Sequence, residues 1–360
     1  MRSVKDWLLR QKDNIRRYVG VILFDRAKQK RQCLDNKPVL FIRWDAKLGD
    51  SIVASWVARE LKKSNAKREV WVVTSSSMAF LYKEHFLFDR VFTIKKRPSY
   101  SELKVLCNDI GDVDYVVHFG KRLKMKDLFF LNRLRAAHAI GLDDRMRLID
   151  IKLGRASFGL HFVDKFKLAL NEMGVESPDS SYILPKDADA IHTMSEWWPN
   201  EGRTFCFNPF GSGNSRKISC ELSAALIDEM LRIDDVQIVL LASEDTRAEA
   251  DKIVNMVGER QRLHLYDGRT SLSMLFSQLE LCSGVISVDT ATVHIASGLG
   301  KPLLAIYNNN QDNYGEWHPN SALASVIFSS DDTREDVNLL SRERFSEHFH
   351  AWYEQYFSQR

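Results

Sequence analysis

Cysteine is scarce in this sequence and follows no pattern. The chain of 360 residues has five scattered cysteines: Cys33, Cys107, Cys206, Cys220 and Cys282. Their spacing argues against a disulfide framework or a zinc site and is typical of a protein in a reducing compartment. No apolar run approaches the roughly 18–20 residues of a membrane span, and no secretory signal is recognisable at the N-terminus. We therefore expect a cytoplasmic protein.

Several catalytic motifs are also absent. The sequence contains no His-Glu-x-x-His, no Gly-x-Ser-x-Gly and no Gly-x-Gly-x-x-Gly. Their absence argues against a metalloprotease, a hydrolase or a dinucleotide enzyme. The pair Asp187 and Asp189 resembles the carboxylates with which some sugar transferases hold a metal, but it lies in a proline-containing stretch away from any expected strand end. We assign no metal site and no bound cofactor.

The composition is that of a soluble globular protein. Hydrophobic residues make up 44% of the chain and charged residues 28%. A chain of this length is expected to form two domains with separate cores.

Charge is unevenly distributed, although the net charge of +3 is small. Residues 1–31 contain ten Lys or Arg and three Asp, a net charge of +7 that leaves −4 for the remainder. Large apolar residues from Trp7 to Phe24 are interleaved with these charges, as in an amphipathic helix. Such a helix either lies on an anionic membrane surface or packs on the first domain with its basic face in solvent. The basic and aromatic pattern does not continue into the body, so nucleic-acid binding is not expected.

Short β-branched runs alternate with helical patterns in two stretches, which predicts an α/β fold with two doubly wound domains. We expect strands at 39–44, 70–74, 91–94, 115–118, 205–208, 237–241, 263–265, 285–288 and 303–306. We expect helices at 51–63, 78–83, 158–173, 191–197, 221–232, 246–257, 272–279 and 334–357. The resulting divisions are a basic N-terminal helical extension (1–37), a first Rossmann-like domain (38–175), a linker (176–203), a second Rossmann-like domain (204–330) and a C-terminal helix (331–360). Ligands of open α/β sheets bind beyond the carboxyl ends of the strands, so we expect the two domains to face a central cleft.

The connection after the first strand contains candidate chemistry. In the run from Arg43 to Asp50, Gly49 permits tight backbone geometry just before a helix begins. Asp50 either caps this helix or accepts a proton from a sugar hydroxyl. The cations Arg43 and Lys47 are our candidates for acceptor binding.

The second domain begins with a strand that leads into a glycine-containing loop, Asn208-Pro-Phe-Gly-Ser-Gly-Asn-Ser-Arg-Lys217. Ser212 offers a hydroxyl, and Arg216 and Lys217 offer positive charge for a diphosphate. The alternative interpretation is a solvated loop. After the next strand, Glu244 either binds ribose hydroxyls or begins a helix.

The segment 286–306 packs a strand, a polar turn, a helix and a second strand into a short stretch. The turn, Asp289-Thr290-Ala291, presents backbone N–H groups at a helix N-terminus, where a phosphate binds readily. Asp289 and Thr290 also suit helix capping, and His294 alone is more typical of a structural residue.

Together and in this order, these motifs resemble glycosyltransferase family 9, the bacterial heptosyltransferases of lipopolysaccharide core assembly. The resemblance runs from about Val39 to Pro302. It rests on Asp289-Thr-Ala-x-x-His294 followed by Gly300-Lys-Pro302, on Leu48-Gly-Asp50, and on the loop after Asn208. The chain departs from the family at Ile218-Ser219, where a Trp-Pro pair is usual.

The resemblance implies the GT-B arrangement, with an N-terminal acceptor domain and a C-terminal nucleotide-sugar donor domain. It implies metal-independent, inverting transfer from a nucleotide-sugar, typically ADP-heptose, to the lipopolysaccharide core. By the same resemblance, Asp50 is the catalytic base. The donor-binding residues that it implies are Ser212, Arg216, Lys217, Glu244, Asp289, Thr290, Ala291 and His294. An acceptor held in the inner membrane would suit a peripheral enzyme that contacts this surface through residues 1–31.

Three other functions remain open at this stage. A related heptosyltransferase would modify a protein acceptor, and a two-domain sugar-nucleotide epimerase would share the fold but need no acceptor. A non-catalytic module would bind the nucleotide-sugar without turnover, although Gly49-Asp50 and the basic loop argue against it.

Overall fold

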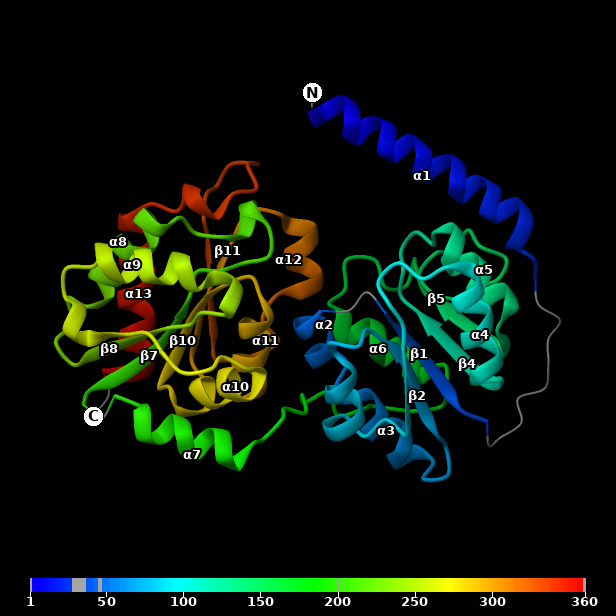
Figure 1. The fold of residues 1–360 in the computed structure, drawn as a ribbon, viewed down its shortest axis with the longest axis horizontal. Helices are drawn as coiled ribbons and strands as arrows, with labels where there is room; N and C mark the ends of the chain where they lie inside the picture. Colours follow the sequence, from blue (N-terminus) through cyan, green and yellow to red (C-terminus); the bar gives the residue numbers. More distant parts are fainter. Residues whose placement is uncertain (1, 28–36, 45–46, 200, 359–360) are drawn as a thin grey trace. The chain divides into compact units, whose positions relative to one another are not determined.

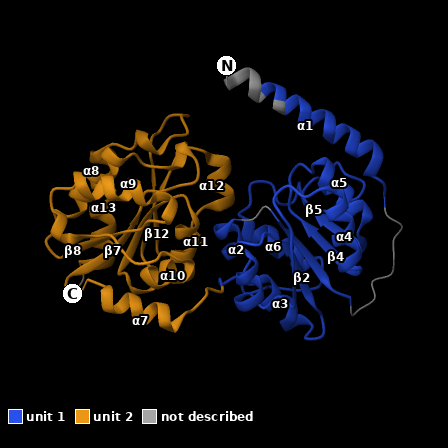
Figure 2. Cartoon of the chain, in the orientation of Figure 1, with its two compact units in different colours: residues 1–182 blue, residues 183–360 orange. Residues whose placement is uncertain are grey.

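The chain folds into two compact units, residues 1–182 and 183–360, in a computed structural model that describes residues 2–27, 37–44, 47–199 and 201–358 (Figure 2). The boundary falls inside the stretch 176–203 that we interpreted as a linker. Most of that stretch belongs to the second unit and includes a helix of ten residues, Ala188–Trp197. Residues 28–36 of the expected N-terminal extension lie outside the described residues.

The first unit is built on a parallel sheet of six strands in the order β3-β2-β1-β4-β5-β6 (Figure 1). Its strands are β1 (Val39–Arg43), β2 (Val70–Thr74), β3 (Arg90–Thr93), β4 (Asp112–His118), β5 (Arg135–Gly141) and β6 (Ile151–Lys152). Its helices are α1 (Arg2–Phe24), α2 (Leu48–Val53), α3 (Val57–Ser64), α4 (Tyr100–Ile110), α5 (Met125–Arg133) and α6 (Phe162–Asn171), with one π-helical turn, η1 (Leu81–His85).

The second unit repeats this plan with the order β12-β11-β10-β7-β8-β9, again parallel. Its strands are β7 (Arg203–Asn208), β8 (Val236–Leu240), β9 (Leu263–His264), β10 (Gly284–Val288), β11 (Leu303–Tyr307) and β12 (Ala324–Phe328). Its helices are α7 (Ala188–Trp197), α8 (Cys220–Met230), α9 (Arg247–Met256), α10 (Leu272–Leu281), α11 (Ala291–Gly298), α12 (Gln311–Trp317) and α13 (Arg342–Phe357). Short 3₁₀ turns lie at η2 (Asn214–Arg216), η3 (Glu244–Thr246), η4 (Arg260–Arg262) and η5 (Val337–Leu339).

The order of strands reverses at one place in each sheet. In the first unit the chain moves outward from β1 to β3 and then returns to pair β4 with β1. In the second unit β10 returns to pair with β7 in the same way. Loops diverge above such a switch point and leave room for a ligand at the carboxyl ends of the two strands. The fold therefore indicates two candidate ligand sites, one formed by the loops after β1 and β4 and one by the loops after β7 and β10.

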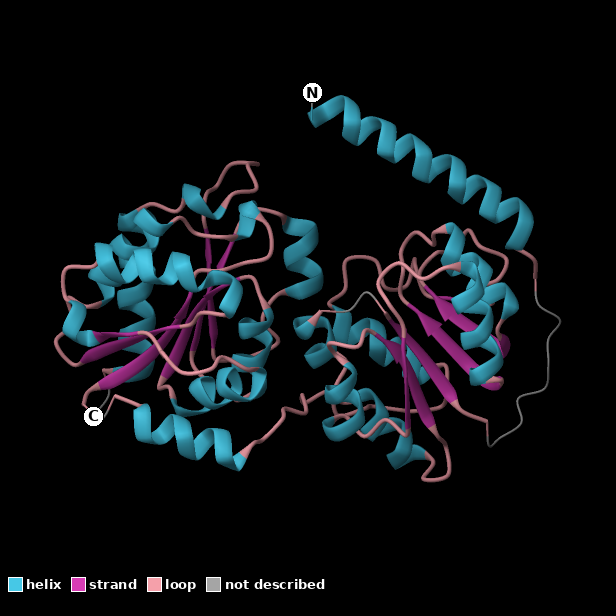
Figure 3. Ribbon diagram, in the orientation of Figure 1, coloured by secondary structure: helices cyan, strands magenta, loops and turns pink. Residues whose placement is uncertain are grey.

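Helices cover both faces of each sheet, as Figure 3 shows, and the central strands are accordingly buried and mostly apolar. Every residue of β1, β2, β10 and β11 is buried. In the second unit, α13 covers β7 with aromatic residues, and the rings of Phe205 and Trp352 lie 5.2 Å apart. Gly284 leaves space for this helix, because a Cβ atom there would stand 2.8 Å from the Trp352 ring.

Helix α1 packs against α5 in the first unit (Figure 1). Arg17 donates to the carbonyl of Leu123 at 3.0 Å and forms an ion pair with Asp143 at 2.8 Å. Phe24 contacts Phe129 edge to face at a centroid distance of 5.3 Å. The expectation that this helix packs on the first domain is confirmed for its C-terminal half. In the described parts of the chain, no helix is both long and apolar enough to cross a membrane.

The expected bounds of two helices were wrong. The helix expected at 51–63 is two helices, because the chain turns at Ala54 to Trp56 and the Trp56 indole donates to the Val53 carbonyl at 2.9 Å. The C-terminal helix begins at Arg342 rather than near 334. Strands β5, β6 and β12 and helices α4, α5 and α12 were not anticipated.

Candidate functional site

The switch point of the second sheet brings two predicted segments together, the loop after β7 and the turn after β10. Asn208, the last residue of β7, donates to the hydroxyls of Thr290 at 3.2 Å and Thr292 at 2.7 Å. Thr290 is the N-cap of α11, and its hydroxyl accepts from the N–H of Thr292. This bonding fixes the first turn of α11, including Ala291, at the carboxyl end of the sheet.

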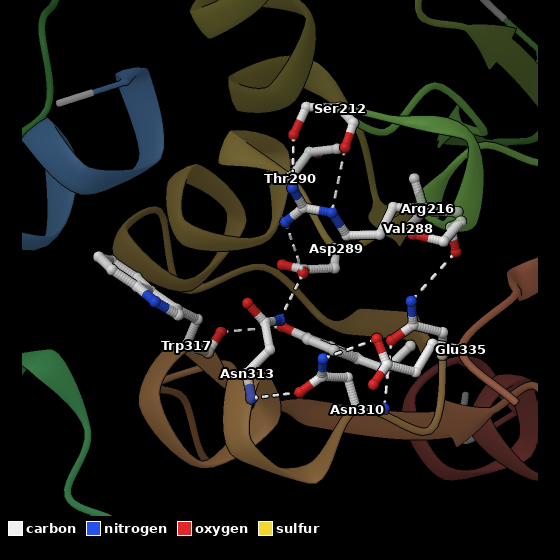
Figure 4. A network of polar contacts seen from close by, with 12 residues as sticks. Ser212, Arg216, Val288, Asp289, Thr290, Asn310, Asn313, Trp317 and Glu335 are labelled. Carbon is white, nitrogen blue, oxygen red and sulfur yellow. Dashed lines mark hydrogen bonds and ion pairs between the residues drawn. The ribbon is translucent and has the colours of Figure 1, made fainter. Parts of the chain in front are cut away.

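Arg216 lies at the centre of the polar network in Figure 4. Its guanidinium forms an ion pair with Asp289 at 3.1 Å and donates to the Ser212 hydroxyl at 2.7 Å. Asn313, from α12, donates to the same Asp289 oxygen at 2.8 Å. The Arg216 side chain keeps 29% of its surface exposed, whereas Asp289 keeps 6%. The predicted residues Ser212, Arg216 and Asp289 are therefore neighbours, and the cation is the member that solvent reaches.

Gly211 shapes the loop after β7. A Cβ atom at this position would stand 1.9 Å from the carbonyl oxygen of Arg216, so the loop closes on its own backbone here. Ile218 donates to the carbonyl of Pro209 at 3.0 Å and completes the closure. The glycine is thus required to shape the loop that presents Arg216.

Lys217 points into a different environment from that of Arg216. Its ammonium forms an ion pair with Glu249 of α9 and lies 5.9 Å from the centre of the Phe210 ring. Its positive charge is therefore largely compensated within the second unit.

His294 is buried in the middle of α11, where it meets the Trp317 ring edge to face at 6.0 Å. Burial, with a smaller contribution from His318, lowers the pKa of His294 from 6.5 to about 4, so the ring is neutral at pH 7. None of the described residues gives its Nδ1 a hydrogen-bond partner. This environment is typical of a packing residue, and the predicted donor-binding role stays a prediction.

A cavity of about 350 Å³ lies at the carboxyl ends of β7 and β8 and against α10. This volume is within the usual range for small-molecule sites. Asn208 and Thr292 belong to both the cavity wall and the switch point. The remaining wall is mostly apolar: Phe210, Leu240, Leu241, Ala242, Ser243, Thr246, Leu265, Tyr266, Thr270, Ser271, Leu272, Met274, Leu275 and Gln278.

Sequence reasoning missed this cavity. The walls come from separate segments of the chain, and no single sequence motif connects them. The one available signal is position, because the loop after β9 and the N-cap Ser271 both follow a predicted strand. Glu244, which was predicted, is exposed at the start of η3, next along the chain to the cavity residue Ser243.

The switch point of the first sheet holds a second pair of opposite charges. Arg43 ends β1 and donates to the Asp50 carbonyl at 3.0 Å, with its guanidinium 3.8 Å from the Asp50 carboxylate. Asp50 also accepts from the N–H of Lys47 at 3.1 Å, as a residue that caps α2. Here the arginine is buried, at 9% exposed, and the carboxylate is 28% exposed. Asp50 thus caps the helix and still offers an oxygen to solvent.

The predicted acceptor-binding cations differ in their surroundings. Arg43 is buried and stacks over Phe166 at 5.6 Å, so it contacts the protein rather than solvent. Lys47 is exposed. Among the described residues, no group of three or more His, Cys, Asp or Glu side chains is placed to hold a metal ion. Metal independence remains a prediction.

The family model described as glycosyltransferase family 9 (heptosyltransferase) matches residues 123–343. A putative lipopolysaccharide heptosyltransferase 4 from Escherichia coli is 23% identical over 316 residues, which cover 84% of each chain. Two solved structures share the fold at 17% identity. One is a family 9 glycosyl transferase from Veillonella parvula (TM-score 0.73, covering 92% of this chain and 100% of that one). The other is the E. coli ADP-heptose lps heptosyltransferase II (TM-score 0.67, covering 88% and 99%).

The family model covers more than half of the chain, and both expectations of fold and of enzyme class are confirmed. The chain belongs to glycosyltransferase family 9, the heptosyltransferases, and is a glycosyltransferase of the GT-B fold.

Proposed function

We propose that this enzyme transfers a heptose or a related sugar from ADP-heptose to a lipopolysaccharide core oligosaccharide, with inversion and without a metal ion or bound cofactor. The observation that carries the proposal is the partly exposed guanidinium of Arg216 at a switch point beside a cavity of about 350 Å³. The names of two relatives support the substrates, because one is an ADP-heptose lps heptosyltransferase and the other a putative lipopolysaccharide heptosyltransferase.

We assign the donor to the second unit. The apolar cavity takes the nucleoside base, and Glu244 at its rim binds the ribose hydroxyls. The diphosphate lies against Arg216, Ser212 and the backbone N–H groups at the start of α11, around Thr290 and Ala291. Asn208 lines the cavity and bonds to Thr290, so base and diphosphate positions are adjacent.

We assign the base to Asp50 of the first unit. As the acceptor hydroxyl oxygen bonds to the anomeric carbon, its proton passes to the Asp50 carboxylate. The bond from the anomeric carbon to the phosphate oxygen breaks, and the electron pair leaves with the nucleoside diphosphate. Arg216 stabilises the charge that develops on this leaving group. Attack opposite the leaving group inverts the anomeric centre.

The acceptor in this proposal is a lipid-anchored glycan, so the enzyme works at the cytoplasmic face of the inner membrane. Lys47 is exposed beside Asp50 and suits an acidic group on the acceptor. Arg43 supports Asp50 through its hydrogen bond to the backbone rather than contacting the acceptor.

A binding screen and a turnover assay test the proposal. ADP-sugars should raise the melting temperature more than UDP- or GDP-sugars, because a ligand that binds the native state stabilises it. ADP release from ADP-heptose should require the core oligosaccharide. Conversion of the sugar nucleotide without acceptor would indicate an epimerase, and a mass increase on a protein would indicate a protein acceptor. Either result would overturn the proposed acceptor.

The cavity assignment has a matched control. Ala242→Trp fills the cavity and should abolish stabilisation by ADP, whereas Ala248→Trp places the same ring at an exposed position on α9. Equal responses to ADP in the two variants would exclude the cavity as the base site.

A further inference from the structure

Helix α1 has two distinct sides, and within the described residues of the first unit one of them packs against the protein. The packed side contains Arg17, Gly20 and Phe24, which contact α5 and its flanking loops. Gly20 is buried, and a Cβ atom there would stand 3.0 Å from the Met125 Cα, so the two helices approach closely. Further bonds from Asn132 to the Phe24 carbonyl and from Leu148 to Asp25 fix the end of α1.

The opposite side of α1 is apolar and exposed. At about 100° per residue, six large residues fall on a stripe roughly opposite the packed side. Each exposes between 38% and 69% of its surface: Trp7, Leu8, Ile15, Tyr18, Val19 and Ile22. The stripe extends over about 22 Å of helix, from Trp7 to Ile22. Gln11 is the exposed polar residue on this side, between Leu8 and Ile15. An exposed apolar surface of this kind marks an interaction site.

Basic residues border this stripe on both edges. Lys12 and Arg16 lie on one edge and Arg10 on the other, and all three are exposed. Lys126 of α5 lies 5.6 Å from the Tyr100 ring, so the helix that packs against α1 adds a further positive charge. An apolar helix face with cations along its edges is the pattern of a helix that lies in the plane of an anionic membrane.

We propose that α1 docks the enzyme on an anionic lipid surface through the stripe from Trp7 to Ile22, while its other side holds the first unit. The two interpretations of the N-terminal segment thus apply to opposite sides of one helix. The stripe inserts its apolar side chains at the level of the headgroups, and Arg10, Lys12 and Arg16 meet the lipid phosphates.

A second copy of the chain fits this surface less well. A symmetric dimer through α1 would bring the same stripe against itself and place its flanking cations near one another. Like charges facing each other in an interface oppose association, whereas an anionic surface complements them.

The experiment is cosedimentation of the full chain with phosphatidylcholine vesicles, with and without phosphatidylglycerol. The stripe variant combines Trp7→Ser, Ile15→Ser and Ile22→Ser, and should lose roughly a hundredfold or more in partitioning. The charge variant combines Lys12→Gln and Arg16→Gln and should lose roughly thirtyfold at low salt, and less at high salt. A control variant, Val105→Ser with Phe158→Ser, removes apolar residues of the first unit that are 58% and 89% exposed elsewhere and should bind as the parent does.

Equal partitioning of the stripe variant and the parent would overturn the proposal, as would equal binding to neutral and anionic vesicles. A parent that is dimeric, that the stripe variant makes monomeric and that binds no vesicles would indicate a second copy as the partner. The charge variant leaves the apolar side chains in place, so it tests the proposal even if the stripe variant folds poorly. Vesicle binding needs no nucleotide and donor binding needs no lipid, so this proposal and the proposed transferase activity fail separately.

Discussion

Each sheet carries an Arg–Asp pair at its switch point, and the two pairs have opposite exposure. In the first unit Arg43 is buried and Asp50 is the exposed partner, at 28%. In the second unit Asp289 is buried and Arg216 is the exposed partner, at 29%. The pairs also differ in closeness, with nitrogen–oxygen distances of 3.8 Å and 3.1 Å.

The difference shows how one topology can offer two kinds of chemistry. In our proposal the exposed member meets a substrate, and the buried member holds it in place. An exposed carboxylate accepts a proton, which suits the acceptor hydroxyl, whereas an exposed guanidinium meets an anion, which suits a diphosphate. If this holds, changing an exposed member should affect turnover, and changing a buried member should affect stability first.

The largest effect should come from Asp50→Asn. The amide keeps the size of the side chain and can still accept from Lys47, but it cannot take a proton. We expect turnover to fall by about 10²- to 10⁴-fold, with nucleotide binding unchanged. Steady-state kinetics and a nucleotide titration measure the two quantities. The matched control is Asp164→Asn, a surface carboxylate paired with Lys167 in the same unit. Normal turnover in Asp50→Asn would remove the first pair from the chemistry.

Arg216→Ala should follow, with a loss of about 10²- to 10³-fold in kcat/KM for the donor. Lys217→Ala provides a close control, because this neighbouring cation is already paired with Glu249. We expect it to cost less than tenfold, since its charge is compensated in the fold. Equal losses of kcat/KM in the two variants would mean that the loop acts through its net charge. The Arg216–Asp289 pair would then have no separate role in donor binding.

A third prediction concerns His294, which is buried in α11 against Trp317. Its folded-state pKa of about 4 lies below the unfolded value of 6.5, so the unfolded chain takes up the proton first. Stability should be complete above pH 6.5 and fall as the pH drops towards 4, by about 3 kcal/mol from this group.

Urea unfolding of the parent and of His294→Phe at pH 7 and pH 5 measures this difference, because other groups titrate alike in both. The variant should lose less stability on acidification and keep its donor KM at pH 7. A raised donor KM with unchanged acid sensitivity would instead support the donor-binding role predicted from the sequence.

The sequence predicted the central strands well, because buried parallel strands are continuous apolar runs with turn residues after them. It did not reveal β5, whose alanine-rich run from Arg135 to Gly141 has little strand preference and is held by pairing with β4. It also missed α5, whose apolar side is completed by α1, more than a hundred residues away in the chain.

The candidate site also has parts that local sequence signals predicted and parts that they did not. The loops after β1, β7 and β10 carry local signals, such as glycines and capping residues, and were found. The Arg216–Asp289 pair joins residues 73 positions apart, and no local pattern encodes which of its members is buried. Lys217 looked equivalent to Arg216 because only the fold directs one side chain to Asp289 and the other to Glu249.

The smallest effect, and the most direct test of the contrast, is Asp289→Asn beside Asp50→Asn. The same change removes a buried carboxylate in one unit and an exposed one in the other. Arg216 and Asn313 both donate to one Asp289 oxygen, and an amide oxygen there carries no charge to pair with Arg216, so we expect the free energy of unfolding to fall by about 2 kcal/mol. Asp50→Asn keeps an oxygen that can accept from the Lys47 N–H, so it should change the free energy of unfolding by less than about 0.5 kcal/mol. Because Arg216 would then lose its fixed orientation, the donor KM of Asp289→Asn should rise while kcat falls less than in Arg216→Ala.

Urea titration measures the free energy of unfolding of the two variants, and donor kinetics measure KM and kcat. Equal losses of stability in the two variants would mean that exposure does not separate the two pairs.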